Sequence, residues 1–185
     1  MRMSSKSTKI IMALALVSAG GVAFAANPMV GGAAMYPTKT IVDNAVNSKD
    51  HTTLVVAVKA AGLVDTLSSK GPFTVFAPTN EAFAALPAGT VDTLLKPENK
   101  ATLTKVLTYH VVAGKHSATE IAAMAKAHGG KAMFKTVEGE QITLMKGPDG
   151  AWWVEDAKGG KGKITIADVN QSNGVIHVVD KVLMP

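Results

Sequence analysis

One stretch of the chain, FTVFAPTNEAF at residues 73–83, combines the signals for a strand and for a helix that follows it directly. Aromatic and β-branched residues fill its first half. Large apolar groups at both odd and even positions predict a strand covered on both faces. Pro78 has no backbone N–H and ends the strand. The hydroxyl of Thr79 can then cap the free N–H groups of a short helix that begins at Asn80. We interpret the stretch as a structural corner, with Thr79 and Asn80 as structural residues.

A sharp turn from strand to helix can also hold a catalytic nucleophile. The chain contains no G-x-S-x-G motif, the pattern that places a nucleophile on such a turn. Asp180 does not form a catalytic pair with His177, because residues three apart on a strand point to opposite faces. The sequence therefore offers no complete catalytic constellation, and we expect a protein that is not an enzyme.

The first 25 residues have the pattern of an export signal. Basic residues precede an apolar run over residues 10–24, which ends in an A-x-A cleavage pattern at residues 23–25. The alternative is a membrane anchor, but the run spans only about 15 residues and contains Gly20 and Gly21, which is short for a span. We therefore expect a signal peptide at residues 1–25, a secreted extracellular or periplasmic protein, and no membrane insertion after cleavage.

Charge and cysteine content argue against a nucleic-acid-binding protein and against a disulfide-bonded domain. The formal net charge is +5, but the only arginine and two lysines lie within the predicted signal. Without arginine the exported chain has no guanidinium fork for phosphate, and no basic cluster stands out, so we expect no nucleic-acid partner. The chain has no cysteine, so the folded domain contains no disulfide.

The exported part divides into a short leader and one domain. Residues 26–37 are rich in Gly, Pro and small side chains without periodicity, which predicts a flexible leader. Within residues 38–185, helical patterns come first and strand patterns later, which indicates an α+β domain built on antiparallel pairs. The strand-like runs of this later part lie at residues 132–137, 141–146, 151–155, 164–169 and 175–183.

Local signals mark several helix ends. Thr38 or Thr40 can cap a first helix, and Gly62 is placed to end a second one in a left-handed conformation. Ser117 and Glu120 form the capping box of a later helix. Near the C-terminus, Asn173-Gly174 is typical of a type I′ turn and predicts a hairpin between the last two strands.

Three motifs together resemble the signatures of the fasciclin-domain family. They are the stretch at residues 73–83, the pair Tyr109-His110, and NGVIHVVD at residues 173–180. Their order and spacing are similar to those of the family over residues 38–185. The resemblance implies a β-sandwich of about seven strands with helices packed at one side. It also implies an exported, non-catalytic binding module for cell adhesion or for contact with extracellular matrix or polysaccharide.

The resemblance also suggests contact residues. In some animal relatives, an Asp-Ile pair before the last motif and the Tyr-His segment are assigned to integrin binding. Asp168-Val169 falls at the first of these positions and Tyr109-His110 at the second. By resemblance, Asp168, Val169, Tyr109 and His110 are candidate contacts for a cell-surface or matrix protein or polysaccharide.

The histidines allow a second interpretation. His110 and His177 lie between apolar strand residues and could ligate a metal, but no third ligand occurs at a recognisable spacing. We expect both to be buried scaffold residues and expect no metal or cofactor. The alternative is a protein that uses these two residues to bind a small ligand or a metal, or an enzyme that does so. His51, His116 and His128 lie near caps and loops and are expected to face water.

Two further features are candidate contacts. If Trp152 and Trp153 lie in a strand, they point to opposite faces, so one joins the core and the other can meet a sugar ring or a partner protein. The alternative, which we favour, is that this tryptophan covers the edge of the sheet. The loop at residues 156–163 is rich in Gly and Lys and could contact an acidic polysaccharide, although such a loop is more often only solvated.

The export signal predicts cleavage after Ala25. We expect mass spectrometry of the exported protein to find Ala26 at its N-terminus. A membrane-bound product that retains residues 1–25 would contradict this prediction.

Overall fold

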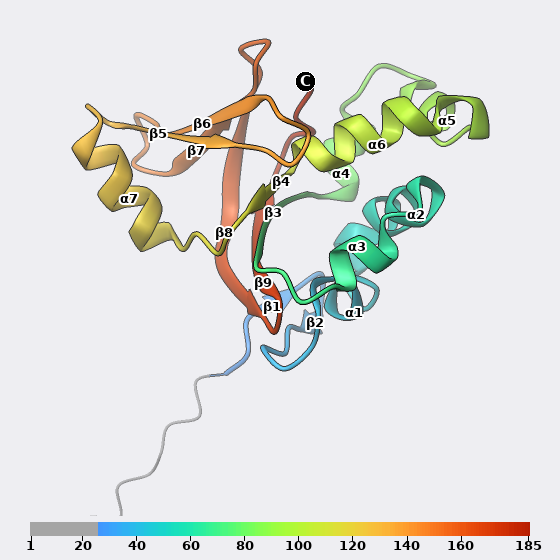
Figure 1. Ribbon diagram of the computed structural model, residues 1–185, viewed down its shortest axis with the longest axis horizontal. Coiled ribbons are helices and arrows are strands. Elements are labelled where there is room, and N and C mark those ends of the chain that lie inside the picture. Colours follow the sequence, from blue (N-terminus) through green and yellow to red (C-terminus); the bar gives the residue numbers. More distant parts are fainter. Residues whose placement is uncertain (1–25) are drawn as a thin grey trace, which may run out of the picture.

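A seven-stranded sheet forms the centre of the computed structural model, which describes residues 26–185 (Figure 1). The predicted signal peptide at residues 1–25 lies outside the described residues. The order of the strands is β4-β3-β9-β8-β7-β6-β5. β3 and β9 run parallel, and the other neighbours are antiparallel. The strand bounds are β3 (Phe73–Pro78), β4 (Val111–Ala113), β5 (Lys131–Lys135), β6 (Gln141–Lys146), β7 (Trp152–Glu155), β8 (Lys161–Gln171) and β9 (Gly174–Val179).

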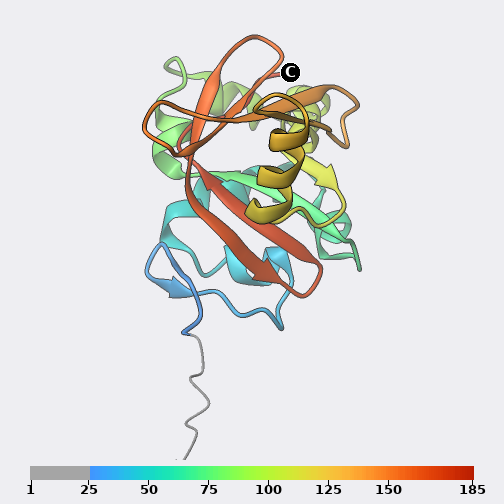
Figure 2. The ribbon, with the colours of Figure 1, turned by 90° about the vertical axis from the view of Figure 1, so that its left-hand side faces the viewer.

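The sheet curls until its two end strands almost meet. Val137 N–H donates to the carbonyl of Val111 at 2.7 Å, and Val112 forms an isolated bridge with Thr136. Helices α1 to α6 lie on one side of the sheet and α7 on the other, as Figure 1 shows; Figure 2 views the sheet from the α7 side. The predicted α+β class with about seven strands is confirmed. The α-helices are α1 (Ile41–Ala45), α2 (Thr52–Ala61), α3 (Val64–Ser68), α4 (Asn80–Ala84), α5 (Thr90–Leu94), α6 (Lys100–Tyr109) and α7 (Ala118–Ala127), with 3-10 turns at Lys49–His51 and Pro97–Asn99.

Two hydrophobic cores lie on opposite faces of the central strands. Alternate residues of β3, such as Val75 and Ala77, face helices α1 to α6 and form what we term the helix-side core. Phe76 points the other way, into the barrel-side core, which the curled sheet and α7 enclose. All six residues of β9 are buried. The expectation that residues 73–78 form a strand covered on both faces is therefore confirmed.

Local capping signals act as the sequence predicts. The Thr79 hydroxyl accepts a hydrogen bond from Ala82 N–H at 3.3 Å at the start of α4. Thr40 and Ser117 each form a complete capping box, and Gly62 ends α2 with a φ of 70°.

Asn80 also links two elements. Its side chain accepts from Thr53 N–H at 3.0 Å and donates to the Lys49 carbonyl at 2.7 Å. The corner at residues 78–80 therefore holds the start of α2 as well as its own helix.

The stretch at residues 26–37 corrects the expectation of a flexible leader. Gly31 and Gly32 have positive φ, and this turn folds β2 (Ala33–Ala34) back on β1 (Met29–Val30). The side chains of Val30 and Met35 are 3% and 2% exposed in the helix-side core. The composition predicted mobility, but two buried apolar side chains and a glycine turn fix the segment.

The turn between β8 and β9 also differs from its prediction. Neither Asn173 nor Gly174 has a positive φ, so the turn is not of type I′. Gly174 is required for another reason. It is paired with Phe73 in the parallel ladder, where a Cβ atom would overlap the Phe73 carbonyl oxygen.

Asn173 is buried and joins the turn to the helical layer. Its Oδ1 accepts from Ile41 N–H at 3.0 Å, and its Nδ2 donates to the carbonyls of Leu67 and Ser69 at 2.7 and 2.8 Å. One amide side chain thus satisfies backbone groups of α1 and of the end of α3.

Within residues 26–185, none of the helices combines the length and the apolar character that crossing a membrane requires.

The close approach at Gly174 predicts a large steric effect. We expect Gly174→Ala to lower the free energy of unfolding by about 3 kcal/mol, because the added methyl group meets backbone that cannot move aside. Gly89→Ala is the control: Gly89 has a φ of 80° but open space around it. We expect only the left-handed backbone penalty there, about 1 kcal/mol. Urea unfolding measures both changes, and equal losses would contradict the packing explanation.

Candidate functional site

Asp168 is held in an unusual backbone conformation within β8. Its φ is 57°, and among residues 26–185 no other residue except glycine has a positive φ. It lies where the β8–β9 pairing shifts register between Ile166 and Val169. Such a bulge turns a side chain away from the regular strand pattern.

Three hydrogen bonds fix Asp168 in this conformation. Its N–H donates to His177 Nδ1 at 3.3 Å, and its carbonyl accepts from the Asn170 side chain at 3.1 Å. Its Oδ1 accepts from Ala118 N–H at 2.7 Å, at the positively polarised start of α7. The side chain is half-buried, and Oδ2 has no hydrogen-bond partner within the described residues.

His177 supports this bulge from inside the barrel-side face of β9. The imidazole is fully buried and stacks on Phe76 with 5.6 Å between ring centroids. Because its Nδ1 accepts from Asp168, its Nε2 carries the proton and donates to the His116 carbonyl at 2.9 Å. Burial lowers the pKa of His177, and the His116 carbonyl and the Asp168 charge oppose this shift only partly.

His110 caps the end of α6 and carries its proton on the other nitrogen. Nδ1 donates to the Val106 carbonyl at 2.8 Å, and Nε2 accepts from Leu183 N–H at 2.9 Å. Burial lowers the pKa of His110 to about 4, against the opposing effects of the Val106 carbonyl and Asp156.

The two histidines therefore have no free ring nitrogen for a metal in this conformation. Both nitrogens of each imidazole are engaged with backbone groups. Within residues 26–185, no group of three or more His, Cys, Asp or Glu side chains is placed to hold a metal ion.

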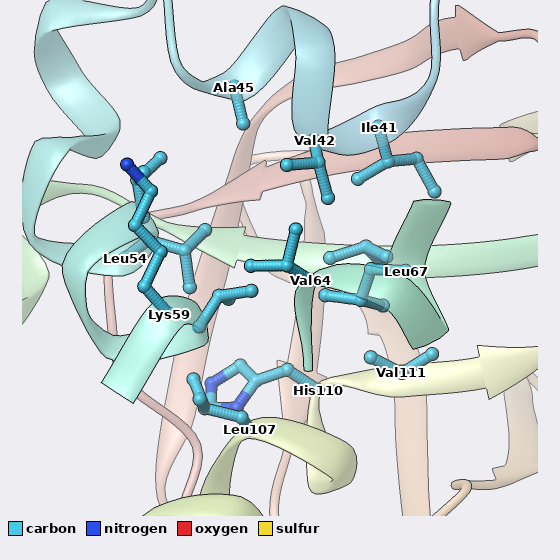
Figure 3. Close-up of a pocket in the computed structure, with 13 residues that line it drawn as sticks. Ile41, Val42, Ala45, Leu54, Lys59, Val64, Leu67, Leu107, His110 and Val111 are labelled. Carbon is cyan, nitrogen blue, oxygen red and sulfur yellow. The ribbon is translucent and has the colours of Figure 1, made fainter. Parts of the chain in front are cut away.

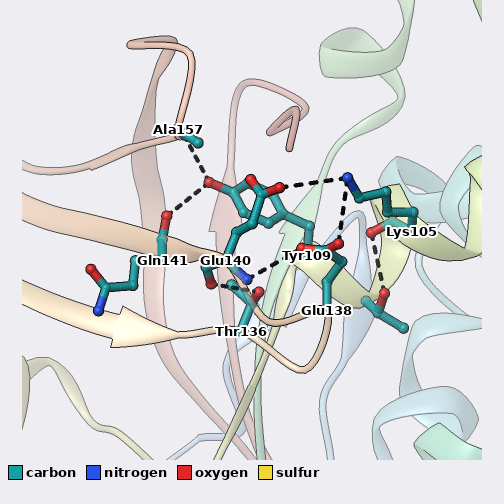
Figure 4. Close-up of polar contacts among 8 residues, drawn as sticks. Lys105, Tyr109, Thr136, Glu138, Glu140, Gln141 and Ala157 are labelled. Carbon is teal, nitrogen blue, oxygen red and sulfur yellow. Dashed lines mark hydrogen bonds and ion pairs between the residues drawn. The ribbon is translucent and has the colours of Figure 1, made fainter.

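Tyr109 is fully buried at the end of α6 (Figure 4). Its hydroxyl donates to the Gln141 carbonyl at 3.0 Å and accepts from Ala157 N–H at 2.8 Å. Burial raises the pKa of this hydroxyl, so it stays protonated and links β6 to the loop after β7. Lys105, one turn earlier in α6, lies 3.5 Å from the carboxylate of Glu140.

The structure separates the four contact residues that the resemblance suggests. Tyr109, His110 and Val169 are 0%, 2% and 0% exposed, so none of these side chains can reach a partner in this conformation. Asp168 alone keeps an accessible side chain. The candidate site is therefore the surface around Asp168, and the other three residues support it or the core.

The tryptophans lie on opposite faces of β7, and both are half-buried. Trp152 packs against the barrel-side core, with Lys146 Nζ 5.8 Å from its ring centroid. Trp153 lies over the preceding hairpin, and its Nε1 donates to Asp149 at 3.2 Å.

The lysine-rich loop at residues 156–163 has less free positive charge than its sequence indicates. Lys163 Nζ lies 2.7 Å from Asp149, and Lys161 Nζ lies 3.7 Å from Glu155. The hydrogen bond from Lys163, with a smaller effect of Trp153, lowers the pKa of Asp149 to about 2. Buried Asp156 accepts from two backbone N–H groups of the loop, those of residues 158 and 160.

His51 contradicts the expectation that it faces water. The 3-10 turn at Lys49–His51 directs it inward, where it is 3% exposed. Its Nδ1 lies 2.9 Å from the Ser48 hydroxyl, and its Nε2 has no hydrogen-bond partner within the described residues. Burial lowers the pKa of His51. No sequence motif marks this site, because His51 shares a hollow with residues distant in the chain, such as Met35 and Ile176.

The buried histidines predict a loss of stability in acid. His110 has a usual pKa of 6.5 when unfolded and about 4 when folded, so the unfolded state binds more protons between these values. The contribution of His110 to the free energy of unfolding is complete above pH 6.5 and is lost as the pH falls towards 4. This loss is on the order of 3 kcal/mol. The pKa of His177 is lowered too and acts in the same direction.

Urea unfolding at a series of pH values measures this loss. Nitrogen-15 NMR provides the control. We expect each imidazole to be neutral, with its single ring proton on Nδ1 in His110 and on Nε2 in His177. Ordinary titration of both rings near pH 6.5 would show that they are not buried in this way.

Comparison with known proteins places the chain in a family. The model of the family described as "Fasciclin domain" matches residues 49–185. Protein sll1483 from Synechocystis sp. is 50% identical over 159 residues, which cover 85% of this chain and 79% of that protein. The cell surface glycolipoprotein MPB83 of Mycobacterium bovis is 34% identical over 161 residues, covering 84% of this chain and 64% of that protein.

A solved structure has the same fold. It is a FAS1 domain pair from the insect cell adhesion molecule fasciclin I, which superposes with a TM-score of 0.71 at 16% identity. The match covers 80% of this chain and 51% of the other, so the chain spans about half the length of that domain pair. The extent of the family match and the identity to these relatives show that the chain belongs to the fasciclin domain family.

Proposed function

We propose that this protein is an exported binding module of the adhesion type, which contacts a cell-surface or matrix protein or polysaccharide and catalyses no reaction. The observation that carries the proposal is the conformation of Asp168. A left-handed conformation is unfavourable for a residue with a side chain and persists only where its surroundings hold it. Strained residues of this kind concentrate at functional sites.

The chemistry of Asp168 supports a contact role. One carboxylate oxygen is fixed by Ala118 N–H, and the other has no partner within the described residues. A carboxylate held in this way is ready to accept a hydrogen bond from a cationic or N–H group of a partner. Because the side chain is already fixed, little conformational entropy is lost when the partner binds.

The buried groups support the absence of catalysis. His110, His177 and Tyr109 are the motif side chains whose chemistry suits acid–base catalysis, and each is engaged with backbone groups away from solvent. A catalytic acid or base must reach the substrate.

Export remains part of the proposal. The signal pattern at residues 1–25 supports a location in the periplasm or outside the cell. The similarity to a cell surface glycolipoprotein and to a cell adhesion molecule supports the same location.

Neutralising Asp168 tests the contact surface. Asp168→Asn keeps the Oδ1 acceptor, and asparagine tolerates the left-handed conformation, so we expect thermal stability to stay close to that of the wild type. We expect attachment of the exported protein to cell or matrix preparations to weaken about tenfold, because a charge-assisted hydrogen bond is lost.

Two matched variants define the result. Asp92→Asn removes an exposed carboxylate of α5, on the other side of the molecule from α7, and should leave attachment unchanged (Figure 1). Replacing Lys158, Lys161 and Lys163 together by glutamine tests the loop at residues 156–163 as an alternative surface. Wild-type attachment by folded Asp168→Asn protein would refute the role of Asp168.

A further inference from the structure

The helix-side core contains a cavity of about 40 Å³ beneath helices α1, α2 and α3 (Figure 3). Val75 of β3, Val111 of β4 and Leu107 of α6 are among the residues that line it. Its lining is apolar except for two residues, Lys59 and His110. A cavity with apolar walls holds water poorly and favours an apolar occupant.

The cavity approaches the surface between the helices. Val42 and Ala45 of α1, Val55 of α2 and Val64 at the start of α3 line it and are only half-buried. An exposed edge of this kind gives a small molecule a route inward without unfolding of the sheet.

His110 contributes no free polar atom to this space. Both of its ring nitrogens are engaged with backbone groups, and its imidazole is neutral near pH 7 because its pKa is about 4. The single charge among the lining residues is therefore that of Lys59.

Lys59 is placed at the edge of the cavity, in the last turn of α2. In Figure 3 its aliphatic part runs along one side of the space, towards Ala45. Within residues 26–185, Lys59 takes part in no ion pair, unlike Lys105, Lys161 and Lys163. Its ammonium group is thus available to an anion, while its methylene groups extend the apolar wall.

We propose that this cavity is a binding site for a short aliphatic carboxylate, with the chain among the valine and leucine side chains and the carboxylate on Lys59. The proposal is separate from the function proposed for Asp168, which lies on the other face of the sheet.

The volume limits the length of the chain. One water molecule needs roughly 10–15 Å³ of such space, so this cavity has room for about three waters or three to four carbon atoms. A second hollow of about 20 Å³ shares four lining residues with it, Ile41, Ala45, Leu54 and Val75. If the two hollows join when a ligand enters, a chain of five or six carbons also fits.

Methyl NMR of the purified protein with acetate, butyrate and hexanoate tests the site. We expect saturable shifts at the methyl groups of Val42, Val58 and Leu107. We expect the affinity to rise roughly fourfold for each added methylene group until the cavity is full. 1-Hexanol is the matched neutral probe and should bind about three- to fivefold more weakly than hexanoate, because it forms no ion pair with Lys59.

Two variants separate the charge from the cavity. Lys59→Met keeps the aliphatic stem and should remove the preference for hexanoate over 1-hexanol, without abolishing binding of either. Ala45→Leu adds volume at a residue that lines both hollows and should weaken both probes at least about tenfold. Ala60→Leu, at an exposed position of α2, is the control for helix stability and should bind both probes as the wild type does.

The outcomes are distinct. Shifts that do not saturate, or that lie away from the cavity, would overturn the site. An unchanged preference for the carboxylate in Lys59→Met would overturn the role of Lys59. If Ala45→Leu unfolds, Val42→Leu repeats the filling test from the same helix. These binding tests of the cavity do not depend on attachment through Asp168.

Discussion

The parallel ladder between β3 and β9 is the contact on which the rest of the structure depends. It pairs Phe73–Pro78 with Gly174–Val179, segments that lie about 100 positions apart in the chain, so it closes a long loop. Both strands are buried on both faces, and this pair therefore separates the helix-side core from the barrel-side core. The approach at Gly174 is so close that no larger residue fits. A change at this ladder disturbs both cores at once.

Buried histidines connect elements that this ladder brings together. A neutral imidazole has one donor and one acceptor, so it can join two backbone groups that would otherwise be unpaired. His110 joins α6 to the C-terminal segment at Leu183, and His177 joins the bulge at Asp168 to the segment before α7. The Tyr-His pair and the last motif of the family are thus explained by architecture. We expect recognition of a partner to use exposed residues instead of these buried side chains.

The sequence predicts those features whose partners are close in the chain. Thr79 caps α4 by accepting from an N–H group three residues away, and Gly62 ends α2, the helix directly before it. Composition and spacing are therefore sufficient to predict both helix ends. Asn173 shows where prediction from local sequence fails. Its Asn-Gly pair favours a type I′ turn locally, but its amide binds Ile41, 132 positions away, and the neighbouring strand sets the conformation of Gly174.

Long-range packing also explains what was missed at the site. The sequence and the family resemblance identify Asp168 as a candidate contact, but not its left-handed backbone. The burial of Tyr109, Val169 and His51 likewise depends on distant elements. No local pattern reveals that a polar or motif residue points inward when the covering residues come from elsewhere in the chain.

Asp168 and the cavity beside Lys59, on which the two proposals rest, lie on opposite faces of the same sheet. Asp168 is attached to the core through His177 and to α7 through Ala118, so its carboxylate shares the rigidity of the barrel-side face. The cavity lies among short helices, where half-buried valines leave room for adjustment. A ligand in the cavity would stabilise the folded state by its own binding energy. It would change the contact surface only if it favoured a different arrangement of the sheet. Since β3 and β9 are tightly packed on both faces, we expect the two sites to act independently, with a fixed surface on one face and an adaptable helical layer on the other.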